Sequence, residues 1–163
     1  MKLPWKTHQK LLFFLALVLF LGTVLTLVIL WDTIPERLTS NIHVLGKTLS
    51  DTSRKSFTLI PMLLIEGFIF VLISLISCFP DAWNCKTEQY PSRSIPKLYS
   101  LTRTTLLASL LWLVGLFSAI TLDQAFNLGL TESLYLIIFG LSFAAILGGH
   151  FFTRRHLKGE RHG

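Results

Sequence analysis

The 163-residue chain is poor in charged residues and in cysteine. Charged residues make up 15% of it and hydrophobic residues 52%, whereas an ordinary soluble domain carries about 25% charged residues. The two cysteines, Cys78 and Cys85, match no metal or redox spacing. Phosphate-binding glycine loops, metalloprotease motifs and nucleophile elbows are also missing from the sequence. We therefore predict no cofactor, no metal ion and no catalytic residue.

Long apolar runs take up more than half of the chain, and its mean hydropathy is +0.60. A helix needs roughly 20 apolar residues to cross the hydrocarbon core of a bilayer. Four segments qualify: residues 11–31, 57–79, 104–122 and 131–152. We predict an all-α membrane protein in which one domain forms a four-transmembrane-helix bundle. The first run exceeds the core of about 7 to 15 residues of an export signal, so we expect it to remain as a helix.

The cations are distributed unevenly between the segments predicted to lie on the two sides of the membrane. Of the 15 Lys and Arg residues, those in the N-terminal tail, the middle loop and the C-terminal tail outnumber those in the first loop. Because Lys and Arg in short flanking segments stay in the cytoplasm, both termini are predicted to be cytoplasmic. The net charge of +6 fits this asymmetry and attraction to anionic membrane lipids, so we expect no nucleic-acid partner.

A single acid, Glu66, interrupts the second apolar run. A carboxyl group inside a membrane span is costly, and it is therefore a candidate functional residue. Its depth, roughly 13 Å at 1.5 Å per residue, matches hydroxyl and small residues on the other helices, including Thr23 and Ser118. Without a cation at that level, we expect a neutral acid hydrogen-bonded to a hydroxyl or carbonyl group. A polar, proton-coupled site open to the outside and a structural hydrogen bond between helices both remain possible interpretations.

The polar segment 32–56 is predicted to be an ordered cap across the outer mouth of the bundle. Pro35 ends the preceding helix sharply, because proline biases the residue before it toward an extended conformation. Gly46 permits a turn, and Pro61 is placed in the first turn of the second helix, where its missing N–H costs least. The candidate ligand-binding residues of the cap are Glu36, Arg37, Asn41 and His43. An ordinary solvated loop is the alternative.

The same segment resembles the signature of SdpI-type small membrane proteins. In that family the first transmembrane helix is followed by a pattern like L-P-x-x-I-P-x-H-x-N-x-x-G, then by a basic residue and by a proline at the start of the next helix. Here the segment reads IPERLTSNIHVLG over residues 34–46. Pro35, Gly46, Arg54 and Pro61 stand in place. Thr39 replaces the second proline, and Asn41 and His43 occur in swapped order.

The resemblance implies an integral protein of the bacterial cytoplasmic membrane that is associated with immunity to a secreted toxic peptide and with signalling. We therefore expect a nonenzymatic binding protein of the envelope, with an amphipathic peptide or lipid-like ligand arriving from outside. The basic middle loop would meet a cytoplasmic or membrane protein partner. Two alternatives stay open: a transporter or transporter accessory subunit that uses Glu66, and a membrane enzyme acting on a lipid or peptide through isolated residues such as Glu66 and His43.

Two features of the third and fourth apolar runs predict packing without identifying a partner. Gly140, Ala144 and Gly148 recur at four-residue spacing, and small residues in this pattern let helices approach closely in a membrane. The receiving helix is either in the same chain or in a second copy. Trp112 lies within the third run, and it either faces lipid or lines a cavity.

Overall fold

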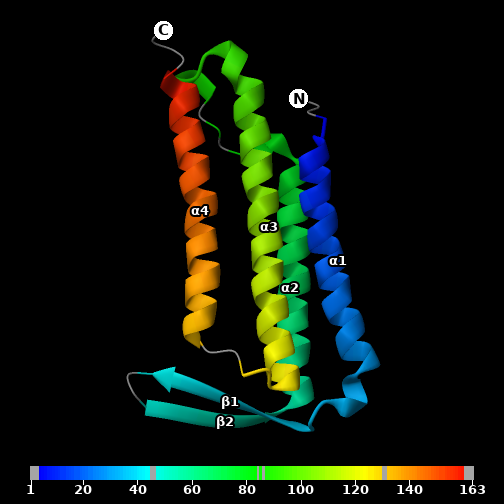
Figure 1. Cartoon of the computed structure of the whole chain (residues 1–163). Helices are drawn as coiled ribbons and strands as arrows, with labels where there is room; N and C mark the ends of the chain where they lie inside the picture. Colours follow the sequence, from blue (N-terminus) through cyan, green and yellow to red (C-terminus); the bar gives the residue numbers. More distant parts are fainter. Residues whose placement is uncertain (1–3, 45–46, 84, 86, 130–131, 160–163) are drawn as a thin grey trace.

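Four antiparallel helices dominate the computed structural model, which describes residues 4–44, 47–83, 85, 87–129 and 132–159 (Figure 1). The chain is mostly helical. The helices are α1 (Thr7–Ile29), α2 (Lys55–Cys78), α3 (Ile95–Phe126) and α4 (Glu132–Gly159). Each contains a stretch that is long and apolar enough to cross a membrane. The prediction of four such helices is confirmed, and they indicate a multi-pass membrane protein.

The helix ends differ from those of the predicted apolar runs. Helix α3 extends beyond its run at both ends and α4 at its C-terminal end, whereas α1 and α2 begin earlier than predicted and also end earlier, at Ile29 and Cys78. The third was expected over 104–122 but begins at Ile95, with a proline in its first turn, where proline is tolerated. It ends at Phe126, and the next residue, Asn127, adopts a left-handed conformation (φ 49°), a common way to stop a helix. α2 begins two residues earlier than predicted, so Pro61 lies in its second turn and the prediction of a first-turn proline is wrong. Thr131 lies outside the described residues.

Helix α3 is the centre of the arrangement, because it packs along α1, α2 and α4. α1 and α2 contact each other less. One contact is the stacking of the rings of Phe20 and Phe70, whose centroids are 5.5 Å apart. α4 stands at the side of the other three helices (Figure 1). No residue in the apolar stretch of α4 that is long enough to cross a membrane is buried. The described chain is thus a three-helix core of α1, α2 and α3 with α4 attached to α3.

Polar contacts fasten α4 to α3. The indole Nε1 of Trp112 donates hydrogen bonds to the carbonyl of Phe139 at 2.9 Å and to Ser142 Oγ at 3.0 Å. Further along, Thr105 Oγ1 lies 2.8 Å from His150 Nδ1. Trp112, which was expected to face lipid or to line a cavity, is half-buried and joins the two helices.

No helix in the described part of the chain packs on the predicted small-residue stripe of α4. Gly140, Ala144 and Gly148 are exposed. A Cβ atom added at Gly140 or Gly148 would meet nothing within 4 Å among the described residues. The stripe faces away because Trp112, Phe139 and Ser142 determine which side of α4 packs on α3. Packing of a second copy of the chain on this stripe stays a prediction.

Segment 32–56 is not an irregular loop. After a short 3-10 turn η1 (Trp31–Thr33), it forms an antiparallel hairpin of β1 (Arg37–Val44) and β2 (Lys47–Arg54). The hairpin lies at the end of the bundle opposite to the start of α1 and the end of α4 (Figure 1). The prediction of an all-helical chain therefore misses two strands, while a cap at one end of the bundle is present. Gly46, the predicted turn residue, lies outside the described residues.

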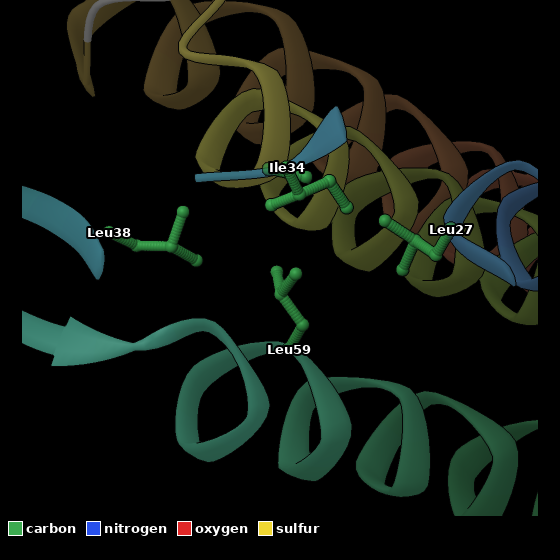
Figure 2. Close-up of a cluster of buried hydrophobic side chains, with 5 residues drawn as sticks. Leu27, Ile34, Leu38 and Leu59 are labelled. Carbon is green, nitrogen blue, oxygen red and sulfur yellow. The ribbon is translucent and has the colours of Figure 1, made fainter. Parts of the chain in front are cut away.

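A cluster of buried apolar side chains ties the base of the hairpin to the bundle (Figure 2). Leu38 of β1 and Ile34 before it meet Leu27 of α1 and Leu59 of α2, with Ala125 of α3 completing the cluster. All five are at most 7% exposed. A two-stranded hairpin is marginally stable alone, so this packing is what fixes its base in place.

Candidate functional site

Glu66 lies in the middle of the three-helix core. Its side chain is fully buried (0% exposed), and Ser118 Oγ on α3 donates a hydrogen bond of 2.8 Å to its Oε1. Depth matching along the sequence predicted a hydroxyl partner for this acid on the third helix, and that contact is present. In this conformation the carboxyl group is enclosed by the helices and does not open to solvent.

Glu66 belongs to a polar layer between two apolar clusters. The layer consists of four buried side chains: Thr23 of α1, Glu66 of α2, and Ser118 and Thr121 of α3. On one side lies the cluster that includes Leu27 and Leu59, and on the other side lies the cluster around Ala16, Leu110 and Val114. Each helix enters the layer between residues of these two clusters, which places the four side chains at one level.

Two oxygen atoms of the polar layer have no hydrogen-bond partner among the described residues: Glu66 Oε2 and Thr121 Oγ1. A buried polar atom without a partner costs about 1–3 kcal/mol, and such atoms in a protein interior call for a proton, a water molecule or a ligand. Thr23 differs, because its hydroxyl donates to the carbonyl of Leu19 in its own helix at 3.0 Å. Thr121 was not predicted, although it follows Ser118 by three residues and shares its helix face.

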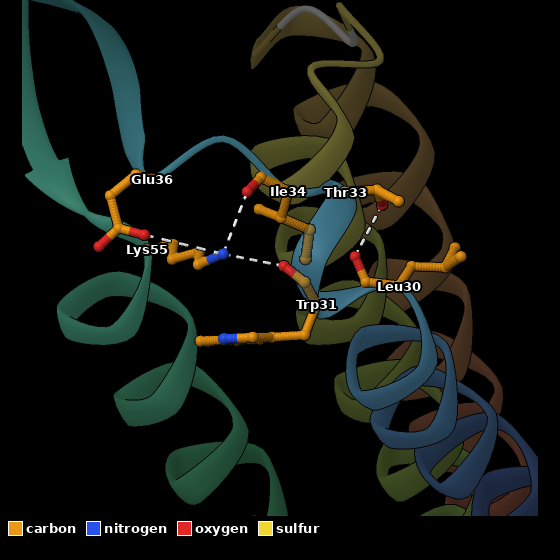
Figure 3. Close-up of polar contacts among 6 residues, drawn as sticks. All are labelled: Leu30, Trp31, Thr33, Ile34, Glu36 and Lys55. Carbon is orange, nitrogen blue, oxygen red and sulfur yellow. Dashed lines mark hydrogen bonds and ion pairs between the residues drawn. The ribbon is translucent and has the colours of Figure 1, made fainter.

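A second polar cluster lies at the base of the hairpin, around Lys55 (Figure 3). Its ammonium Nζ donates to the carbonyls of Trp31 at 2.9 Å and Ile34 at 3.2 Å. It also lies 3.8 Å from Glu36 Oε2 and 5.1 Å from the centre of the Trp31 ring. Lys55 is only 9% exposed. Its buried ammonium group therefore stabilises the turn between α1 and β1 by hydrogen bonds to two of its carbonyls.

The predicted cap residues fall at different places on the hairpin. Pro35 follows Ile34, whose φ of −74° and ψ of 131° give the extended conformation expected before proline. Glu36 and Arg37 are exposed at the start of β1. Asn41 and His43 lie in β1, where Ser50 and Thr48 are their register partners. The side chains of Asn41 and His43 lie outside the described part, so their ligand-binding role stays a prediction.

The opposite end of the bundle contains a buried arginine, Arg103, which is 3% exposed. Its Nε donates to the carbonyl of Ser77 in the last turn of α2 at 3.2 Å. The guanidinium group lies 5.4 Å from the ring centre of Trp5 and 5.5 Å from that of Trp83. This arrangement joins the N-terminal arm and the α2–α3 connection to the end of α2. From sequence Arg103 was only one of the loop cations, so its structural role was missed.

Comparison of the chain with known protein families, curated proteins and solved structures gives no significant match. The resemblance to the SdpI-type signature therefore stays a prediction. Within the described residues no group of three His, Cys, Asp or Glu side chains is placed to hold a metal ion. The functional interpretation consequently depends on the hairpin and the polar layer.

Proposed function

We propose that the chain is a nonenzymatic binding protein of the bacterial cytoplasmic membrane that recognises an amphipathic peptide or lipid-like ligand arriving from outside. The observation that carries the proposal is the hairpin fixed at the end of the apolar helices by Lys55 and the leucine cluster. A two-stranded hairpin would fluctuate on its own. Anchoring its base lowers the conformational cost of binding, because less order has to be created when a ligand arrives.

In this proposal the hairpin faces the outside and both termini face the cytoplasm. The start of α1 and the end of α4 lie at the same end of the bundle, and the hairpin lies at the other end (Figure 1). Most cations of the chain belong to segments at the end that carries the termini, which is the asymmetry that retains such segments in the cytoplasm. Cysteine labelling of Arg37→Cys and Lys10→Cys in intact cells, each with Cys78 and Cys85 replaced by serine, tests this: a membrane-impermeant reagent should label the first position alone.

Immunity or signalling in response to a secreted toxic peptide is the role that we propose for this binding. Deletion of the gene should sensitise cells to one or more members of a panel of amphipathic antimicrobial peptides. Protection should return with the wild-type gene and should be lost with Arg37→Gln, which changes an exposed hairpin residue. Lys10→Gln is the matched control, because it removes one exposed cation at the other end of the bundle. Equal sensitivity of the deletion strain and the parent to every peptide would contradict the proposal.

The unpaired Glu66 Oε2 and Thr121 Oγ1 favour a second candidate function, that of a transporter or a transporter accessory subunit. Acids buried in membrane spans are typical of proton and substrate pathways. Here the polar layer would hold the proton or substrate while the helices alternate between arrangements. Glu66→Gln should then abolish transport in cells while the protein stays folded and inserted. Transport at the wild-type rate would exclude a role for the acid.

A further inference from the structure

Two arginines stand directly opposite each other at the base of the hairpin. The register pairs Arg37 of β1 with Arg54 of β2, and both are exposed. The adjacent hydrogen bond, from the N–H of Lys55 to the carbonyl of Glu36 at 3.0 Å, makes Arg37 and Arg54 a non-hydrogen-bonded pair. In such pairs the Cα atoms are about 4.5 Å apart and the side chains lie closest. Like charges in this position destabilise a hairpin.

No acid in the described part of the chain forms an ion pair with either arginine. The nearest carboxylate in sequence, Glu36, is instead directed to Lys55, with 3.8 Å between Oε2 and Nζ. Two guanidinium groups held side by side form a strong binding site for a group with several anionic oxygens, because each presents a planar fork of N–H donors. Binding an anion there would also remove the repulsion between the two cations.

The position of the arginine pair next to the apolar surface of α2 indicates which anionic group would lie close to it. Arg54 immediately precedes α2, and Phe57 follows three residues later, hence on the same helix face and about 4.5 Å further along the axis. Phe57 is 74% exposed, and Ile60 (46%) and Leu64 (68%) continue an exposed apolar surface along α2. In a membrane such side chains contact acyl chains, which places the arginine pair at the level of the lipid headgroups.

We propose that Arg37 and Arg54 together bind the phosphate of an anionic phospholipid, with its acyl chains against Phe57 and Ile60. The site goes beyond the binding of a ligand from outside, and either proposal can fail without the other. A bound headgroup would hold the base of the hairpin on the membrane surface, adding to the anchoring by Lys55.

Native mass spectrometry of the full-length protein in detergent tests the site, with phosphatidylglycerol and phosphatidylcholine as the added lipids. Wild-type protein should retain phosphatidylglycerol more tightly than phosphatidylcholine. The affinity of the double variant Arg37→Gln/Arg54→Gln for phosphatidylglycerol should fall by at least about tenfold. This is the loss expected when charge-assisted hydrogen bonds are removed. The double variant Lys6→Gln/Lys10→Gln is the matched control, because it removes two exposed cations at the other end.

Three outcomes would overturn the proposal. Equal losses in the two double variants would show unspecific attraction by net charge. Equal retention of the two lipids by wild-type protein would show that the headgroup charge is not recognised. Full displacement of phosphatidylglycerol by an equal concentration of inorganic phosphate would show a free-anion site in place of a lipid site. The amide of Leu38 serves as the folding control, since its exchange protection must be equal in all variants for the comparison to be made.

Discussion

Replacement of Lys55 by methionine should release the hairpin from the bundle without unfolding the helices. Methionine keeps an unbranched apolar stem and removes the ammonium group that contacts the carbonyls of Trp31 and Ile34 (Figure 3). Hydrogen bonds to charged groups contribute about 1.5–3 kcal/mol each, and the contact with exposed Glu36 adds about 0–1 kcal/mol. Desolvation of the ammonium group offsets part of this sum. We expect Lys55→Met to weaken docking of the hairpin base by about 2–4 kcal/mol.

Native-state hydrogen exchange in lipid nanodiscs measures this directly, because amides of the hairpin base exchange through local opening. A loss of about 2–4 kcal/mol corresponds to exchange roughly 30- to 1,000-fold faster. The amide of residue 55, which donates to the carbonyl of Glu36, and that of Leu38 are the relevant probes. Amides in the middle of α3 should be unchanged, and Lys10→Met should leave all of them unchanged. Exchange at Leu38 within about twofold of wild type would refute the assigned role of Lys55.

Two further predictions concern the contact of Ser118 with Glu66 and the buried Arg103. Both are predictions of the free energy of unfolding, measured by denaturant titration of the purified protein in micelles. Ser118→Ala should cost about 1–3 kcal/mol, because Glu66 Oε1 then loses its hydrogen-bond donor, whereas Thr23→Ala should cost less, since that hydroxyl bonds within its own helix. Equal costs for the two would contradict the special position of Ser118. Arg103→Met should cost about 2–4 kcal/mol through loss of the contact with Ser77 and of both tryptophan contacts. An unchanged unfolding midpoint would show that Arg103 does not cap α2.

The helices could be predicted from sequence because a membrane span is defined by one physical requirement, a run of roughly 20 apolar residues. Their ends could not, because helices continue past the hydrocarbon core wherever tertiary contacts support them. α3 begins at Ile95, nine residues before the predicted start at 104, in a region that packs through Leu98 against Tyr90 and Leu157. Hydropathy carries no information on such contacts.

The hairpin was missed for a different reason. Its strands are rich in polar residues, so the sequence predicted an ordered cap but no pairing of strands. Alternation of Leu38, Ile42 and Val44 with polar residues is the signal that indicates a strand with one apolar face. That pattern spans few residues, and only the packing of Leu38 against Leu27 and Leu59 makes the strand pairing favourable. The decisive contacts come from helices on either side of the hairpin in sequence.

The contact between Glu66 and Ser118 could be predicted because the rise of an α-helix is constant, so depth follows from residue number. Lys55 could not be predicted in this way, since its partners are backbone carbonyls, which every residue has. The same is true of Arg103 at the other end. Both cations donate hydrogen bonds to carbonyls close to the end of a helix and lie near tryptophan rings, a favourable place for positive charge.

These two cations change how charge counting along the sequence should be interpreted. Each was taken as evidence for the side of the membrane on which its loop lies, yet each is buried and holds a helix end to its neighbour. In the proposed orientation Lys55 lies on the outer side, where its hydrogen bonds to the carbonyls of Trp31 and Ile34 offset the cost of its unfavourable sidedness. In the proposed orientation, the asymmetry has to reside in the exposed cations as a group, so no single replacement among them should invert the protein. Replacing the buried Arg103 should disturb stability instead of orientation.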